Sequence, residues 1–264
     1  MVSQMEPPAR GVRPGRHHPG MATYDTDAIV LRSIRYSEAD VVLALSTRTR
    51  GRVSAIAKGA RRTNSRLGGR LQPGMRVQVS IHEGRGDLGT IRGASVIDAH
   101  AGLWVAGHRL QSAGCVLETV MKVMPEEEPS EEAWHLLVRT LDLLARAPAP
   151  EGPARLDPIV LGCQAKLLVV SGLLPVLAMC ARCGAAPPLP AFSPAAGGAV
   201  CPACGAGSEP VEPTALAALA ALVGRPLAEA REAMPRGAAA GVERLIGLVL
   251  REHLGVRLRS AAPL

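Results

Sequence analysis

The chain has 264 residues, a formal net charge of +7 and 47% hydrophobic residues. This length accommodates one large domain or two to three small ones, and the apolar content excludes wholesale disorder. The excess positive charge favours a polyanionic partner. The sequence contains no run of about 18 apolar residues, so no membrane span is predicted. The N-terminus also lacks the hydrophobic stretch of a secretory signal. We therefore expect a cytoplasmic protein with no membrane partner.

The first twenty residues are rich in Pro, Gly and Arg and have no periodicity. We expect residues 1–20 to be a disordered extension, and Met21 is as good a candidate for the natural start as Met1. From 21 to 99, β-branched runs alternate with turn residues, and strands are predicted at 28–34, 41–47, 53–57, 75–81 and 88–97. Five short strands predict a small closed barrel, of which the OB-fold is the commonest type.

After Asp98 the apolar residues recur at helical spacing, which predicts an all-α helical domain. The expected helices are 103–124, 131–147, 159–173, 214–223, 227–233 and 238–254. Ser130 is the expected N-cap of the second helix, and the acidic residues 126–128 before it are interpreted as a solvated helix end. The predicted fold is therefore α+β and multidomain. An OB-fold barrel (21–99) precedes a helical domain (100–177 and 208–264), which is interrupted by a Cys-rich module (178–207).

Two CxxC pairs lie in this module, with seventeen residues between Cys183 and Cys201. Two such turns facing each other form a tetrahedral four-sulfur site suited to Zn²⁺. Because four Cys ligands leave no open coordination position, we expect one structural zinc ion per chain. The expected ligands are Cys180, Cys183, Cys201 and Cys204. Redox-active or free cysteines are the alternative, but a redox motif is a single CxxC beside a βαβ unit.

Glycines follow the second Cys of each pair, and Gly184 and Gly205 are expected to adopt the positive φ that lets amides approach sulfur. The two remaining cysteines, Cys115 and Cys163, lie on apolar helical stripes. We interpret them as small buried hydrophobic residues.

The segment from Arg48 to Arg76 contains nine Arg or Lys residues and no Asp or Glu. A solvated surface normally mixes both signs, so this asymmetry predicts nucleic-acid binding, against the alternative of a loop that only repels other proteins. Aromatic residues are few here, so binding should depend on phosphate neutralisation, be salt-sensitive and be weakly sequence-selective. The expected DNA contacts are Arg48, Arg50, Arg52, Lys58, Arg61, Arg62, Arg66 and Arg70.

Several segments, taken in order, resemble the RecO family: AIVLR (28–32), YSEAD (36–40), LST (45–47), GRVSAIAKGARR (51–62), SRL (65–67) and LQP (71–73). The helical middle and the four-Cys module are similar to many members as well. The resemblance implies a recombination mediator that binds single- and double-stranded DNA and anneals complementary strands. It also implies RecR as a partner, binding of the C-terminal tail of single-strand-binding protein, and assistance in RecA loading. It carries DNA contact onto Lys58, Arg61, Arg62 and Arg66.

The sequence lacks the motifs of the nucleic-acid enzymes that we considered. Lys58 is followed by Gly59, Ala60 and Arg61, without the Asp of a ligase K-x-D-G motif, and no His has Glu two residues later as in zinc deaminases. No Walker loop is present. We therefore expect a non-catalytic protein. An RNA- or transcription-associated OB/zinc binder is the second hypothesis, which comparing RNA with DNA affinity would separate. An unrecognised nucleic-acid enzyme is the third, which annealing without nucleotide or divalent cation would exclude.

Overall fold

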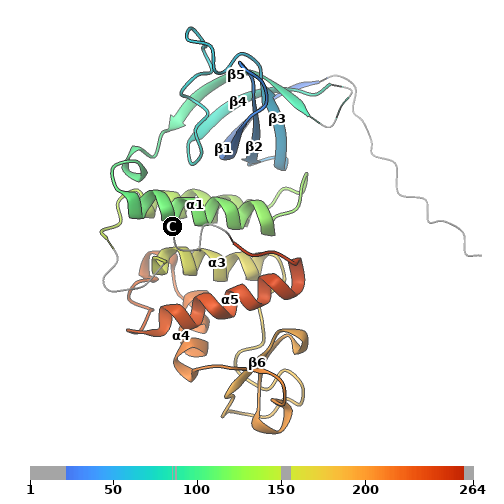
Figure 1. The fold of residues 1–264 in the computed structure, drawn as a ribbon, viewed down its shortest axis with the longest axis vertical. Helices are drawn as coiled ribbons and strands as arrows, with labels where there is room; N and C mark the ends of the chain where they lie inside the picture. Colours follow the sequence, from blue (N-terminus) through green and yellow to red (C-terminus); the bar gives the residue numbers. More distant parts are fainter. Residues whose placement is uncertain (1–21, 85, 87, 150–155, 259–264) are drawn as a thin grey trace, which may run out of the picture.

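The computed structural model describes residues 22–84, 86, 88–149 and 156–258. These residues form a β-barrel at one end, a layer of helices in the middle and a small sheet at the far end (Figure 1). The predicted disorder of residues 1–20 lies outside the described residues, as do residues 85 and 87 between the strands predicted at 75–81 and 88–97. Among the described helices, none combines the length and the apolar character that crossing a membrane requires.

The barrel closes in the strand order β1-β2-β3-β5-β4, with β4 returning to β1. All its pairs are antiparallel except β3 with β5. This is the five-stranded Greek-key arrangement of the OB-fold, so the predicted fold class is confirmed. The strands are β1 (Thr23–Arg35), β2 (Val41–Thr47), β3 (Gly51–Ala57), β4 (Arg76–His82) and β5 (Gly89–Asp98).

The two faces of β1 belong to two different cores. Ala28 and Val30 point into the barrel, where they join the alternating residues Leu43 and Leu45 of β2. Ile29 and Leu31 point the other way and pack with the buried residues of the helices. A side-chain period of two therefore lets one strand fill the barrel and dock the helical domain at the same time.

The helices follow the predicted pattern with two differences. The N-cap prediction is confirmed, since the Ser130 hydroxyl accepts a hydrogen bond from the Ala133 N–H at 3.2 Å. The predicted helix from 103 is broken at residues 104–106, which are not helical and follow a short 3-10 turn. The predicted helix 227–233 is reduced to one 3-10 turn between Pro226 and Pro235. The elements are η1 (Ala101–Leu103), α1 (Gly107–Val123), α2 (Glu131–Leu144), α3 (Pro158–Val170), α4 (Pro213–Gly224), η4 (Leu227–Glu229) and α5 (Ala238–Leu254).

The Cys-rich module contains a three-stranded sheet in the order β7-β6-β8, which the sequence did not predict. Its strands have only two or three residues, too few to show a period in the sequence. Phe192, Ala199 and Val200 are fully buried in the same core as the helices, so the module is anchored to them. Its elements are β6 (Ala191–Ser193), η2 (Pro194–Ala196), β7 (Gly198–Val200), η3 (Pro202–Cys204) and β8 (Glu209–Pro210).

The α1–α2 connection forms the joint between barrel and helices. The Glu127 N–H donates to the Arg52 carbonyl at 3.0 Å, and the Glu126 carboxylate lies 2.8 Å from the Arg52 guanidinium. Gly51 has φ +66°, and a Cβ added there would lie 2.2 Å from the Glu128 carbonyl oxygen. Residues 126–128 are exposed after the end of α1, as expected, but the segment is also docked on the first residues of β3, which the sequence did not predict.

Candidate nucleic-acid interface and metal centre

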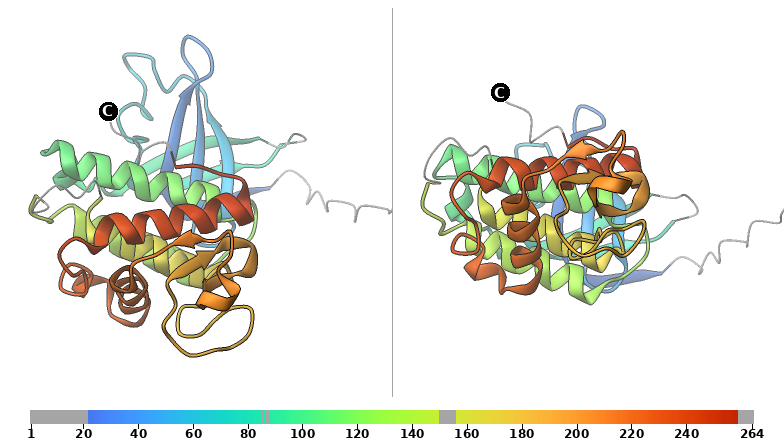
Figure 2. Two further views of the ribbon diagram at one scale, coloured as in Figure 1. Left: turned by 60° about the horizontal axis from the view of Figure 1, so that its bottom comes forward. Right: turned by 90° about the horizontal axis from the view of Figure 1, so that it is seen from below.

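The residues after β3 form an exposed loop, here called the basic loop (residues 58–70), at the end of the barrel that projects away from the helices (Figure 2, left). Its five cationic side chains are exposed, and within the described residues none has a carboxylate at ion-pair distance. They are Lys58, Arg61, Arg62, Arg66 and Arg70. Two of them donate to backbone carbonyls: Arg61 to Glu38 at 2.9 Å and Arg70 to Ala94 at 3.2 Å.

The other three predicted DNA contacts lie elsewhere. Arg48 and Arg50 are in the β2–β3 turn and Arg52 is the second residue of β3, whereas Lys58 follows the end of that strand. At about 3.3 Å per residue, the seven residues of β3 separate the two groups by roughly 20 Å. The eight predicted DNA contacts therefore form two separate groups at opposite ends of the β2–β3 ribbon.

These three arginines also have acidic partners from outside the basic segment. Arg48 lies 3.7 Å from Glu131, Arg50 lies 3.1 Å from Glu83, and Arg52 lies 2.8 Å from Glu126. The Arg52 Nε also donates to the Met124 carbonyl at 3.2 Å. A segment without acidic residues in sequence is thus partly neutralised in space, and two of the three carboxylates come from the helical domain.

Two aromatic residues near the barrel are also engaged by arginines. The Arg50 guanidinium carbon lies 4.5 Å from the centre of the Tyr24 ring, and that of Arg76 lies 5.9 Å from the Trp134 ring. Burial, followed by the negative charge of Glu83, raises the pKa of the Tyr24 phenol. These cation–π contacts are intramolecular, so both rings serve packing within the protein.

Arg35 is a cation that sequence reasoning missed. In the strand register it lies opposite Val41, which lies opposite Ala57, so Arg35 and Lys58 share one end of the barrel. It is exposed and has no carboxylate partner among the described residues. The only signal in the sequence is its position before the β1–β2 turn, and that signal is meaningful only once the register is known.

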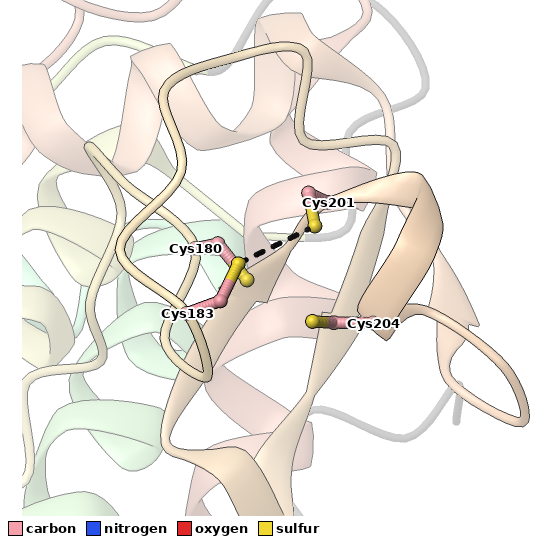
Figure 3. A group of neighbouring side chains, drawn as sticks. All are labelled: Cys180, Cys183, Cys201 and Cys204. Carbon is pink, nitrogen blue, oxygen red and sulfur yellow. Dashed lines mark hydrogen bonds between the residues drawn. The ribbon is translucent and has the colours of Figure 1, made fainter.

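The four predicted metal ligands converge from two turns (Figure 3). Their sulfur atoms all lie within 4.8 Å of one another, and Cys183 and Cys201 are separated by 3.7 Å. A tetrahedral site with Zn–S bonds of 2.3 Å has sulfur–sulfur edges of about 3.8 Å. The donor set and its spacing therefore fit a zinc ion.

Each turn is held by backbone hydrogen bonds. In the first, the Gly184 N–H donates to the Cys180 carbonyl at 2.9 Å, and Gly184 has φ +74° as predicted. In the second, the Cys204 N–H donates to the Cys201 carbonyl at 3.1 Å. The prediction for Gly205 is wrong, because it has φ −85°. A Cβ there would lie 3.2 Å from the Cys201 carbonyl, so close packing is what favours glycine.

The thiols differ in how easily they lose a proton. Backbone hydrogen bonding from Cys201 lowers the pKa of the Cys180 thiol to about 6, against the opposing effect of burial. Side-chain hydrogen bonding with Cys183 and Cys201 raises the pKa of the Cys204 thiol to about 12. One thiolate therefore forms readily, whereas four thiolates this close together need a bound cation to offset their repulsion.

The remaining cysteines are buried, as predicted: Cys115 and Cys163 have no exposed surface. Burial raises the pKa of the Cys163 thiol to about 12. A second group of donor atoms comprises Asp98, His100 and Asp142. His100 of this group already connects the barrel with α2. Its Nδ1 donates to the Gly74 carbonyl at 2.7 Å, and its Nε2 lies 3.3 Å from the Asp142 carboxylate. We interpret this group as structural.

Comparison with known proteins covers nearly the whole described chain. The family model described as "Recombination protein O N terminal" matches residues 21–100, and "Recombination protein O C terminal" matches residues 106–262. The chain is 38% identical over 250 residues to "DNA repair protein RecO" of Rubrobacter xylanophilus, covering 92% of this chain and 96% of that protein. It is 35% identical over 245 residues to the protein of that name in Myxococcus xanthus, covering 91% and 96%. A third, from Bifidobacterium longum subsp. infantis, is 37% identical over 188 residues, or 69% and 74%.

Proposed function

The chain belongs to the RecO family of DNA repair and recombination mediator proteins, and from that premise we propose that its basic loop binds the phosphates of single- and double-stranded DNA and thereby promotes annealing. The observation that carries the proposal is the set of five exposed cations in this loop that have no carboxylate partner among the described residues. Arg35 extends the same surface. We assign Arg48, Arg50 and Arg52 to intramolecular ion pairs instead.

The chemistry of annealing fits this surface. Two complementary strands repel each other through their phosphates, and cations that screen both strands lower that repulsion. Few aromatic residues are available to hold the bases, so base edges stay free to pair. No covalent bond is made or broken, and the function requires no catalytic group.

We also propose that the four cysteines hold one structural Zn²⁺ per chain. Its ligands would be Cys180, Cys183, Cys201 and Cys204, and four thiolates would fill its coordination shell. When bound, the ion supplies the cross-link between the turn before β6 and the turn after β7. Its role is to stabilise residues 178–207, whose strands have only two or three residues each.

In the cell, we propose that the protein acts in the cytoplasm, at the nucleoid. There it would act with RecR and assist RecA loading on strands coated by single-strand-binding protein, whose C-terminal tail it would bind. We infer these partners from the chain's membership of the family alone. We propose the barrel (21–99) as the DNA-binding unit, and the helical domain (100–177 and 208–264) with its Cys module (178–207) as the unit for protein partners.

An annealing assay tests this function. Its substrates are complementary oligonucleotides coated with the cognate single-strand-binding protein. The wild-type protein should accelerate annealing without nucleotide or added divalent cation. A variant with Lys58→Gln, Arg62→Gln and Arg66→Gln should lose at least about tenfold of this acceleration, because three phosphate contacts are removed. The matched control is Arg48→Gln with Arg50→Gln, which removes cations that already have carboxylate partners.

Two results would contradict the proposal. Full annealing by the triple variant would exclude the basic loop, and a requirement for ATP hydrolysis would indicate an enzyme. Tighter binding to RNA than to DNA of the same sequence would favour an RNA-associated role instead.

A further inference from the structure

The most exposed aromatic ring of the protein lies beside the basic loop. Tyr36, in the turn between β1 and β2, is 69% exposed, compared with 45% for Trp104 and 3% for Trp134. Phe192 is fully buried, and Tyr24 is partly buried against the barrel core and Arg50. Tyr36 is thus the one aromatic residue of the barrel whose ring is largely free to meet a ligand.

Hydrogen bonds fix the β1–β2 turn to the basic loop. The Arg61 guanidinium donates to the carbonyls of Ser37 at 3.3 Å and Glu38 at 2.9 Å. The Arg61 N–H donates to the Ala39 carbonyl at 2.9 Å, and the Gly59 N–H donates to the Asp40 carboxylate at 2.8 Å. The turn carrying Tyr36 and the loop carrying the cations therefore form one unit. Both project from the same end of the barrel (Figure 2, left).

Several cations lie at the end of the barrel that carries Tyr36. Arg35 precedes Tyr36, and the strand register brings Lys58 to the same end of the barrel. Arg62 lies three residues beyond Gly59, whose N–H is bonded to the turn. Glu38, the exposed carboxylate of this turn, has its carbonyl held by Arg61 and no ion pair among the described residues. Tyr36 therefore shares this end of the barrel with Arg35, Lys58 and Arg62, which can bind phosphates.

The structure gives Tyr36 no packing role of its own. Its side chain belongs to neither buried core, and its hydroxyl forms no hydrogen bond with the described residues. The turn is ordered by the backbone instead, since the Tyr36 N–H donates to the Asp40 carbonyl at 3.1 Å. Removing the ring should therefore leave the barrel intact.

We infer that Tyr36 stacks on an unpaired nucleobase while the neighbouring cations bind the adjoining phosphates. Any base presents a π face, so the contact is tolerant of sequence but requires a base that is not stacked within a duplex. Tyr36 would therefore give this surface a preference for single strands over duplex. A single stacking residue holds one base and leaves the others free to pair. The inference rests on the proposed function, since it assumes that the basic loop binds DNA.

Two oligonucleotides of equal length test the inference: oligo(dT), and the same backbone with abasic sites in place of every thymine. Binding is measured by fluorescence anisotropy for the wild-type protein, Tyr36→Leu, Tyr36→Phe and the control Trp104→Leu, which removes an exposed ring outside the barrel. Wild type should bind oligo(dT) about five- to tenfold more tightly than the abasic strand. Tyr36→Leu should lose this factor on oligo(dT) and bind abasic and duplex DNA like wild type.

Tyr36→Phe should behave like wild type because it keeps the ring, and Trp104→Leu should change nothing. Equal affinity of wild type for both strands, or an equal loss by Tyr36→Leu on both, would overturn the inference while leaving phosphate binding by the loop in place. Failure of wild type to bind either strand would overturn the proposed function as well. The wild-type comparison needs no variant, so the inference can be refuted even if Tyr36→Leu does not fold.

Discussion

At the scale of single residues, the contact between Gly51 and Glu128 shows how closely the helical domain meets the barrel. Gly51 has φ +66°, a conformation that costs other residues roughly 1–3 kcal/mol, and an added Cβ would lie 2.2 Å from a backbone oxygen. Gly69 has a similar φ of +73°, but nothing lies within 4 Å of its added Cβ. The two glycines therefore separate backbone strain from steric overlap.

We predict that Gly51→Ala lowers the free energy of unfolding by about 2–4 kcal/mol, since strain and overlap add. Gly69→Ala should cost about 1–2 kcal/mol from strain alone. Urea unfolding of both variants measures the difference. An equal loss in the two variants would show that the docking of residues 126–128 on β3 is wrong.

Residue type alone could not predict every role. Gly184 and Gly205 occupy equivalent positions after their Cys pairs, yet only Gly184 has positive φ. Arg48 and Arg62 both lie in the segment that has no Asp or Glu. Arg48 nevertheless has a carboxylate partner from α2, whereas Arg62 has none among the described residues. Spacing predicts which residues share a turn, but an ion pair depends on which distant segments the fold brings together.

At the scale of elements, hydrophobic periodicity predicted four of the five barrel strands to within two residues. It missed the start of β1, which begins at Thr23, five residues before the predicted start at Ala28. The segment 23–27 is polar, and its pairing with β4 comes from backbone hydrogen bonds that leave no apolar pattern. The strands of the Cys module escaped prediction because two or three residues are too few to show a period.

For this module we predict that purified protein contains one zinc per chain and that Cys201→Ser abolishes zinc binding. Without the ion, the two turns lose their cross-link, so limited proteolysis should cut within residues 178–207 and spare the barrel, whose core is separate. Metal analysis and mass spectrometry of the fragments measure both effects. Cys163→Ala, which changes a buried thiol outside the cluster, should keep the zinc. Equal protease resistance with and without metal would refute the structural role.

At the scale of the whole molecule, ion pairs and hydrogen bonds connect the barrel to the helices. Arg52 has a side chain only 20% exposed and bonds both the Glu126 carboxylate and the Met124 carbonyl. His100 connects the Gly74 carbonyl, at the end of the barrel's long loop, with Asp142 of α2. The sequence predicted the order of the two domains, but these contacts span up to 74 residues and carry no local pattern.

We predict that Arg52→Met lowers the free energy of unfolding by about 1–3 kcal/mol, because it leaves a partly buried carbonyl and a carboxylate without their donor. Arg62→Met, an exposed arginine with no partner among the described residues, should change it by less than about 0.5 kcal/mol. Chemical denaturation measures both, and combining Arg52→Met with Glu126→Gln should give less than the sum of the single losses. Additive losses would indicate that the pair does not connect the domains.

The salt dependence of single-stranded DNA binding tests most directly whether the basic loop binds the phosphates of DNA. For Lys58→Gln with Arg62→Gln and Arg66→Gln, the slope of log affinity against log salt concentration should be smaller in magnitude by about 2, or about 0.7 for each lost contact. Arg48→Gln with Arg50→Gln should keep the wild-type slope. A wild-type slope in the triple variant, or an equal reduction in the control, would contradict the account.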